Sequence, residues 1–425
     1  MTPPTKHTMK HHTILIAGVV ALCTGLVLAT GPGFARQSGT RTTTYAFKST
    51  GYGTRVLGGQ VPAGSQTSGF QVIGCTNRAG VSRENNVGQA DVPGLGTASD
   101  IKTRVWTTDR KGVVASHSRH TIGHLDLAST GVGSLSLDSI RSTTRAYHDS
   151  SGFHATASTS LGGITLTPPT GPAQSFPAPA PGQPVDIPGL ATIYAGRTHV
   201  RHDDSGALAE AVALRIDVIP TDTSVKVGHS RSELDSGLTY GVFGGHSDGT
   251  SVPTAAGGIA KSGRNPLSVM PCQGTQGTVH RKAIDHSDLG GQAVARGLAT
   301  KEWAKQGASS AHGYERGSVA KFSLGGGQLV IRGIVGKAAV SRDAHGIVRS
   351  ARGTSVGTVK VNGQAQSFPP TGVLEIPGVA KLERHVVTRT KTGLQVIGLR
   401  VTLLDGTGAV FDLGEATMRV RSLPH

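Results

Sequence analysis

The most regular feature of the chain is an alternation of apolar and polar residues with a period of two. Leu214, Ile216 and Val218 are separated by Arg215 and Asp217. Successive side chains of a β-strand point to opposite faces of its sheet, whereas a helix repeats every 3.6 residues or so. The alternation therefore predicts strands that bury one of their two faces.

The same pattern recurs along the chain and is bracketed by turn residues. Residues 399–403 alternate in the same way, residues 203–206 precede the first stretch, and residues 405–408 follow the second. Aspartate, serine and glycine in these segments are typical of tight turns. The best helical stretch, 297–306, is short, and the proline-rich stretch 167–188 is expected to be a long loop. Many short strands with such turns predict an all-β fold of the sandwich or barrel type.

A self-comparison of the sequence predicts that this fold is duplicated. Cys75 and Trp106 recur as Cys272 and Trp303, in each case 197 residues later. The two tryptophans of the chain therefore occupy matching positions of the repeat, and so do these two cysteines. Further matches join residues 173–177 to 365–369, 186–190 to 375–379, and 214–216 to 399–401.

The repeat sets the expected domain organisation. We predict two tandem β-sandwich-like units, at residues 44–236 and 237–425, after a short linker at 36–43. A weaker match between residues 91–95 and 186–190 suggests that each unit consists of two related halves, which makes four related halves in all.

The N-terminal region has the three parts of a secretory signal peptide. Lys6 and Lys10 precede an apolar to weakly polar run at residues 14–28, and small residues lead to Ala35. This order predicts a signal peptide at residues 1–35, cleaved after Ala35. A retained membrane anchor is the alternative, but the run is shorter than the roughly 20 residues that span a bilayer. We expect a secreted, extracellular protein that associates with the cell surface and has no stable membrane insertion after cleavage.

The charge of the chain indicates anionic partners. Loss of Lys6 and Lys10 with the signal peptide would lower the formal net charge from +16 to +14. Such a charge favours anionic cell-wall polymers or polysaccharides. Nucleic acid is not expected, because the basic residues are spread singly and aromatic residues make up only 4% of the chain.

The cysteines and tryptophans are candidate structural residues. In an oxidising compartment Cys75 and Cys272 are expected to pair, and a pseudo-twofold arrangement of the units would bring them face to face. The alternative is two separate buried thiols, one in each core. Trp106 and Trp303 are expected to be core residues, because large aromatic side chains usually anchor packing.

Two motifs suggest chemistry, and in both cases the simpler interpretation is preferred. Residues 353–357 (Gly-Thr-Ser-Val-Gly) spell the nucleophile elbow of hydrolases, but a glycine- and serine-rich chain produces this match by chance. His117, His120 and His124 would cluster on a helix as metal ligands do, whereas on a strand a spacing of three points to opposite faces. We therefore predict no catalytic residue, no cofactor and no metal site.

Several segments together resemble the choice-of-anchor P family of secreted or surface proteins from high-GC Gram-positive bacteria. The segments that carry the resemblance are residues 357–363, 375–379, 399–401 and 413–416. The resemblance implies a secreted or surface protein and neither a reaction nor catalytic residues. Members of the family carry differing C-terminal anchors, and we recognise no such signal in residues 421–425.

These observations favour a non-catalytic, cell-envelope-associated or extracellular binding or structural protein whose basic surface contacts anionic wall polymers. The alternative function is an extracellular hydrolase of polysaccharide or peptide. A pocket in which acidic residues converge, or a serine beside a histidine, would favour the hydrolase. A flat face with dispersed arginines would favour binding.

Overall fold

The structure, a computed structural model, describes residues 39–58, 65, 67–92, 96–130, 133–219, 222–254, 262–290 and 293–423. The predicted signal peptide and its cleavage site lie outside these residues. The described part of the chain is all-β, as predicted, with four antiparallel sheets and the short 3-10 turn η2 (Gly325–Gly327). No helix in that part is long and apolar enough to cross a membrane.

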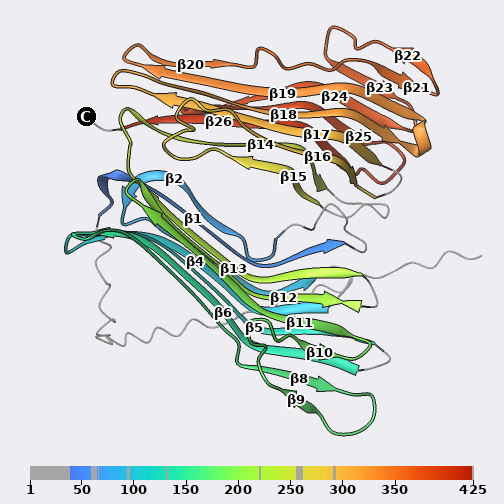
Figure 1. The fold of residues 1–425 in the computed structure, drawn as a ribbon. Coiled ribbons are helices and arrows are strands. Elements are labelled where there is room, and N and C mark those ends of the chain that lie inside the picture. Colours follow the sequence, from blue (N-terminus) through green and yellow to red (C-terminus); the bar gives the residue numbers. More distant parts are fainter. Residues whose placement is uncertain are drawn as a thin grey trace, which may run out of the picture. The chain divides into compact units, whose positions relative to one another are not determined.

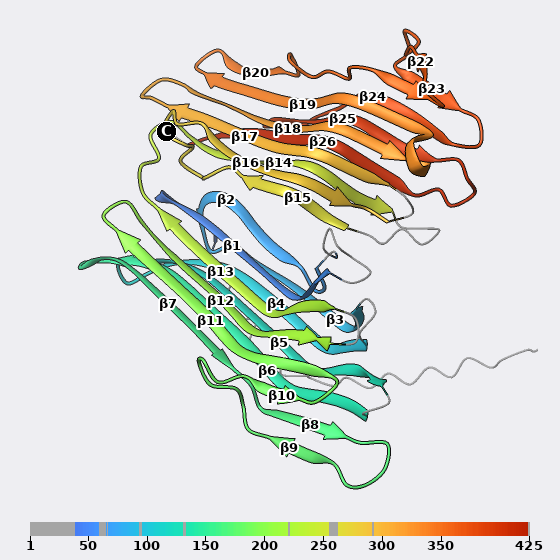
Figure 2. The same ribbon diagram turned by 45° about the vertical axis from the view of Figure 1, so that its right-hand side comes forward.

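The first sandwich consists of two sheets that pack face to face (Figures 1 and 2). Sheet I has the order β10 (Val185–Ile187), β11 (Ala191–Asp203), β12 (Gly206–Val218), β13 (Thr223–Asp235), β1 (Arg41–Gly58), β2 (Gln71–Ala79). Sheet II has the order β3 (Ser82–Val92), β4 (Gly96–Arg110), β5 (Val113–Thr130), β6 (Gly133–Asp149), β8 (Gly163–Thr167), β9 (Gln174–Phe176), and β7 (Gly152–Ser160) also pairs with β6.

The second sandwich follows the same plan. Sheet III has the order β23 (Val373–Ile376), β24 (Ala380–Arg389), β25 (Gly393–Leu403), β26 (Val410–Ser422), β14 (Gly241–Thr254), β15 (Ser262–Val269). Sheet IV has the order β16 (His280–Asp288), β17 (Val294–Gln306), β18 (Ala311–Leu324), β19 (Leu329–Asp343), β21 (Val359–Val361), β22 (Gln364–Gln366), and β20 (Gly346–Ser350) also pairs with β19. Every strand of the first sandwich has a counterpart at the same place in the second.

Two details differ from the expected boundaries. Strand β1 begins at Arg41, inside the expected linker at 36–43, because Arg41 and Thr42 already pair with β2. The stretch 167–188 contains the short strands β9 and β10 and is therefore not a continuous loop. Between the sandwiches, β13 ends at Asp235 and β14 begins at Gly241.

Each sandwich has two apolar clusters with a polar or glycine-rich layer between them, which we call the waist. Along β6, Ile140 belongs to the larger cluster and Ala146 to the smaller one, and Ser142 and Thr144 lie between them. Hydroxyl groups face each other across the first waist: Ser142 with Ser230 and Thr144 with Ser232, each at 2.8 Å, and Ser49 with Ser116 at 2.6 Å. Buried hydroxyls that satisfy one another avoid the cost of losing water.

The waist of the second sandwich combines glycine with a buried hydrogen bond that the hydroxyl of Ser247 donates to Glu315. Along β19, Ile334 and Ala338 belong to different apolar clusters, and Gly336 separates them. A side chain at Gly336 would collide with the backbone oxygen of Gly414 on the facing sheet. The two sheets therefore approach each other backbone to backbone at this level.

A disulfide connects the two sandwiches. The sulfur atoms of Cys75 on β2 and Cys272 after β15 lie 2.05 Å apart, and their Cα atoms are 5.2 Å apart. Ala46 and Val242 complete a small buried apolar cluster around them. By strand register Ala46 corresponds to Val242, so the sandwiches meet here through two pairs of equivalent residues.

Candidate binding faces and an acidic pocket

The outer face of sheet II is basic and aromatic. On β4 the residues Ile101, Thr103 and Val105 are buried, so Arg104 and Trp106 point to the opposite, outer side. The first basic–aromatic face consists of Lys102, Arg104, Trp106, His117, Arg119, Arg141, Arg145 and Tyr147, which the strand register places on one side of β4, β5 and β6.

Aromatic rings and guanidinium groups stack on one another across this face. The rings of Trp106 and His117 are nearly parallel, with centroids 4.7 Å apart and 3° between their planes. The guanidinium carbons of Arg104 and Arg119 lie 5.1 and 5.8 Å from the centroid of Trp106. Burial, followed by Arg145 and Arg119, lowers the pKa of His117 to about 4, so this imidazole is neutral near pH 7.

The cations of this face are not neutralised by the protein. Among the described residues, Lys102, Arg104, Arg119, Arg141 and Arg145 form no ion pair with a carboxylate. The side chains of Arg104 and Arg141 contact only the hydroxyls of Ser82 and Thr143 by hydrogen bonds. Their charges are therefore free to meet an anion from solution.

The outer face of sheet IV repeats the arrangement. The second basic–aromatic face consists of Arg281, Lys301, Trp303, Lys305, Tyr314, Arg316 and Lys337. Trp303 stacks on Tyr314 with centroids 5.9 Å apart and 21° between the planes, and Lys337 Nζ lies 4.7 Å from the Tyr314 centroid. The neighbouring Arg281 and Arg316 lower the pKa of Lys301, which shows that the cations lie close together.

The position of the tryptophans corrects the sequence prediction. Trp106 and Trp303 were expected in the core, but neither belongs to an apolar cluster, and both are half-buried on an outer face. The reason is strand parity, because the residues on either side of each tryptophan, such as Val105 and Thr107, fill the interior. A signal was present in the sequence, since each tryptophan follows a cation two residues earlier, Arg104 or Lys301.

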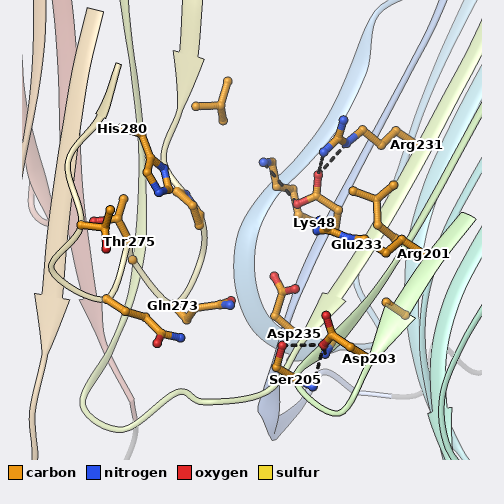
Figure 3. Close-up of a pocket in the computed structure, with 18 residues that line it drawn as sticks. Lys48, Arg201, Asp203, Ser205, Arg231, Glu233, Asp235, Gln273, Thr275 and His280 are labelled. Atoms are coloured by element: carbon orange, nitrogen blue, oxygen red, sulfur yellow. Dashed lines mark hydrogen bonds and ion pairs between the residues drawn. The ribbon is translucent and has the colours of Figure 1, made fainter. Parts of the chain in front are cut away.

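A separate cavity of about 460 Å³ lies beside the disulfide and is lined by both sandwiches. Figure 3 shows Glu233 and Asp235 of β13 on one wall, and His280 and Thr275 of the second sandwich on the other. We call it the acidic pocket. In the second sandwich the register places Arg419 and Arg421 where the first has Glu233 and Asp235. At these positions the acid pair is therefore present in the first sandwich alone.

The two acids of the pocket differ in protonation. Burial, followed by the neighbouring Glu233 carboxylate, raises the pKa of Asp235 to about 7. Burial alone would also raise the pKa of Glu233, but Lys48 and Arg231 lower it below its usual value. Lys48 Nζ lies 3.4 Å from Glu233, and Arg231 donates hydrogen bonds to the same carboxylate. Asp235 can therefore donate a proton near neutral pH, whereas Glu233 is an anion held by two cations.

The histidines singled out in the sequence do not form a metal site. His117 stacks on Trp106, and His120 is fully buried with its Nδ1 2.7 Å from the hydroxyl of Thr103. His124 is exposed and lies 2.6 Å from Asp138. The three imidazoles thus have different partners.

The hydrolase-like motif lacks the structural context that the motif requires. Residues 353–357 lie between β20 and β21, and Ser355 forms an isolated bridge with Val335. Ser355 is exposed, and the described residues around the motif form no strand-to-helix turn.

The fold defines an all-β protein of two sandwich-like units in tandem. No protein-family model matches the chain, and no curated protein matches its sequence.

Proposed function

We propose that the protein is a secreted, non-catalytic binding protein that holds anionic cell-wall polymers or acidic polysaccharide on its two basic–aromatic faces. The observation that carries the proposal is the repeated group of an unpaired cation, a tryptophan, a second stacked ring and a further cation. In the first face these are Arg104, Trp106, His117 and Arg119.

The chemistry of this group fits a charged sugar polymer. Guanidinium and ammonium groups bind carboxylate and phosphate oxygens, and half-exposed aromatic rings offer flat apolar surface to sugar rings. Two such faces in one chain would allow one polymer to engage both, which raises the apparent affinity without new contacts. Secretion, predicted from residues 1–35, would bring the protein to such polymers. The resemblance to the choice-of-anchor P family agrees with this location and remains a proposal.

The test compares two variants with the same loss of charge. Arg104→Ala, Arg119→Ala, Lys301→Ala and Arg316→Ala together should weaken binding to purified wall polymer about tenfold or more, because several exposed contacts of about 0.5 kcal/mol each are lost. The control removes four exposed cations elsewhere: Arg352→Ala, Lys360→Ala, Arg389→Ala and Lys391→Ala.

Sedimentation with cell-wall preparations at increasing salt supplies the measurement. The control should bind nearly as the parent does, and salt should release the protein. Equal weakening in both variants would mean that net charge alone acts. Salt-insensitive partitioning, or equally tight binding of single-stranded nucleic acid, would contradict the proposal.

The alternative, an extracellular hydrolase of polysaccharide or peptide, is favoured by one observation, the acidic pocket with its proton-bearing Asp235. It is the second choice because Glu233, the other carboxylate, is neutralised by Lys48 and Arg231 and is a poor base or nucleophile there. Hydrolysis of a panel of acidic polysaccharides that disappears in Asp235→Asn would establish this function. Retained activity in that variant, or no activity in the parent, would count against it.

A further inference from the structure

A cluster of metal-ligating groups lies on the outer side of sheet III, apart from the binding faces and the acidic pocket. His246 and Asp248 are two residues apart on β14 and therefore share a side. Glu415 on β26 lies directly across from Asp248 in the strand register. One ligand atom from each of the three residues lies within 4.8 Å of the others.

Two of the three side chains are buried. The side chain of Asp248 is 0% exposed and that of Glu415 is 3% exposed, whereas His246 is 25% exposed and leaves a route to solvent. Two carboxylates placed side by side without water repel each other unless a cation or a proton lies between them. The cluster therefore needs positive charge.

The protein supplies that charge unevenly. Glu415 Oε1 has three partners: Gln395 Nε2 at 2.8 Å, His246 Nε2 at 3.1 Å and Arg264 Nη2 at 3.5 Å. Asp248 has only the Nε of Arg264, 3.1 Å from its Oδ2 and outside hydrogen-bonding geometry, and neither of its oxygens accepts a hydrogen bond from the described residues. A fully buried carboxylate in this situation is rare and costly.

A divalent cation bound beside both carboxylates would offset their repulsion. It would also bond to the oxygens of Asp248, which accept no hydrogen bond from the described residues.

We infer that His246, Asp248 and Glu415 form a binding site for a divalent transition-metal ion of the zinc type. One imidazole nitrogen with two carboxylate oxygens matches zinc and its neighbours, whereas calcium and magnesium prefer oxygen ligands alone. Arg264 is 43% exposed and can move away when the ion enters. This site is independent of the proposed polymer binding.

The first sandwich supplies a matched control at the same place in its fold. Its residues in register with Asp248 and Glu415 are Tyr52 and His229, whose rings stack with centroids 4.5 Å apart. His229 also contacts Glu210 at 3.1 Å. A His229→Gln variant therefore disrupts a histidine–carboxylate pair on an outer face without touching the inferred ligands.

The experiment titrates zinc into the full chain after treatment with a chelator, by calorimetry and by elemental analysis of dialysed protein. The parent should bind one more zinc ion per chain than His246→Gln or Asp248→Asn, and His229→Gln should bind as the parent does. Differences between variants cancel any zinc held by His7, His11 and His12 near the N-terminus, which all variants share. Cobalt can be titrated in place of zinc, and its visible absorption should rank the parent and the variants in the same order.

A further variant separates a metal site from a simple ion-pair cluster. Arg264→Gln removes the competing cation and should tighten zinc binding at this site about tenfold, because one nearby positive charge is removed. Circular dichroism identifies any variant that does not fold, and His246→Gln, at a partly exposed position, keeps the test valid if Asp248→Asn does not. Equal zinc binding in parent, His246→Gln and Arg264→Gln would overturn the inference.

Discussion

The two sandwiches have the same strand order but close their waists in different ways. In the second sandwich four glycines meet where the sheets approach most closely: Gly317, Gly336, Gly398 and Gly414. The residues in register with them in the first sandwich are His120, Ser142, Ala213 and Gly228. At these positions one waist is filled by an imidazole and hydroxyl groups. The other is closed by backbone against backbone, next to the buried pair of Ser247 and Glu315.

The common topology requires a bulge at the waist but does not fix the side chains that fill it. Gly228 and Gly414 both have positive φ angles, +66° and +64°, so the bulge at this point is present in both sandwiches. The distance between the sheets is set instead by the neighbouring side chains. The same fold therefore tolerates either an imidazole and a hydroxyl or glycine at these positions, provided that the facing positions change together.

The largest effect is expected from a side chain placed in the glycine waist. Gly336→Ala should lower the free energy of unfolding by about 3 kcal/mol or more, because its Cβ would meet the backbone oxygen of Gly414, which cannot rotate away. Chemical denaturation followed by circular dichroism measures the loss.

The control for this variant is the equivalent residue of the first sandwich. Ser142→Ala removes one hydroxyl contact with Ser230 and should cost only about 1 kcal/mol. If both variants lower the free energy of unfolding by the same amount, the two waists do not differ in the way described.

The buried imidazole is expected to make stability depend on pH. For each pH unit, the change in the free energy of unfolding should be smaller than the change caused by Gly336→Ala. Burial, followed by repulsion from His229, lowers the pKa of His120 from 6.5 to about 3. Between these values the unfolded chain binds a proton that the folded protein does not. The free energy of unfolding should therefore fall as the pH drops from 6.5 towards 3, by at most about 1.4 kcal/mol per pH unit for this group.

His120→Gln tests this contribution, because glutamine does not titrate. Denaturation curves between pH 7 and pH 4 should show a shallower loss of stability in the variant than in the parent. Some slope will remain, because the pKa of His117 is also lowered, to about 4. An unchanged slope in the variant would show that His120 is already protonated or accessible in the folded state.

Much of the fold could be predicted from the sequence because it depends on local patterns. The alternation around Ile216 indicates a strand with one buried face, and that residue is fully buried in β12. The register itself could not be predicted. The exact meeting of Gly336 with Gly414 depends on two sheets far apart in the sequence, and no local pattern marks it.

The candidate sites were less predictable. Cys75 and Cys272 were expected to pair because they occupy equivalent positions of the repeat and an oxidising compartment favours a disulfide, and the structure contains this bond. The basic–aromatic faces were missed because an alternating pattern does not show which of the two sides of a strand faces outwards. The side that carries Trp106 could therefore not be assigned. The acidic pocket was missed because the pKa of Asp235 is raised by burial in the folded protein, and no sequence pattern indicates that burial.

The bond between Cys75 and Cys272 gives the chain a second covalent route between its sandwiches. The peptide route runs through residues 236–240, between β13 and β14. A protease that cut this connection would leave the two pieces attached, and the pieces would separate only after reduction of the disulfide. A nicked molecule could thus continue to present both of its basic–aromatic faces on a single particle.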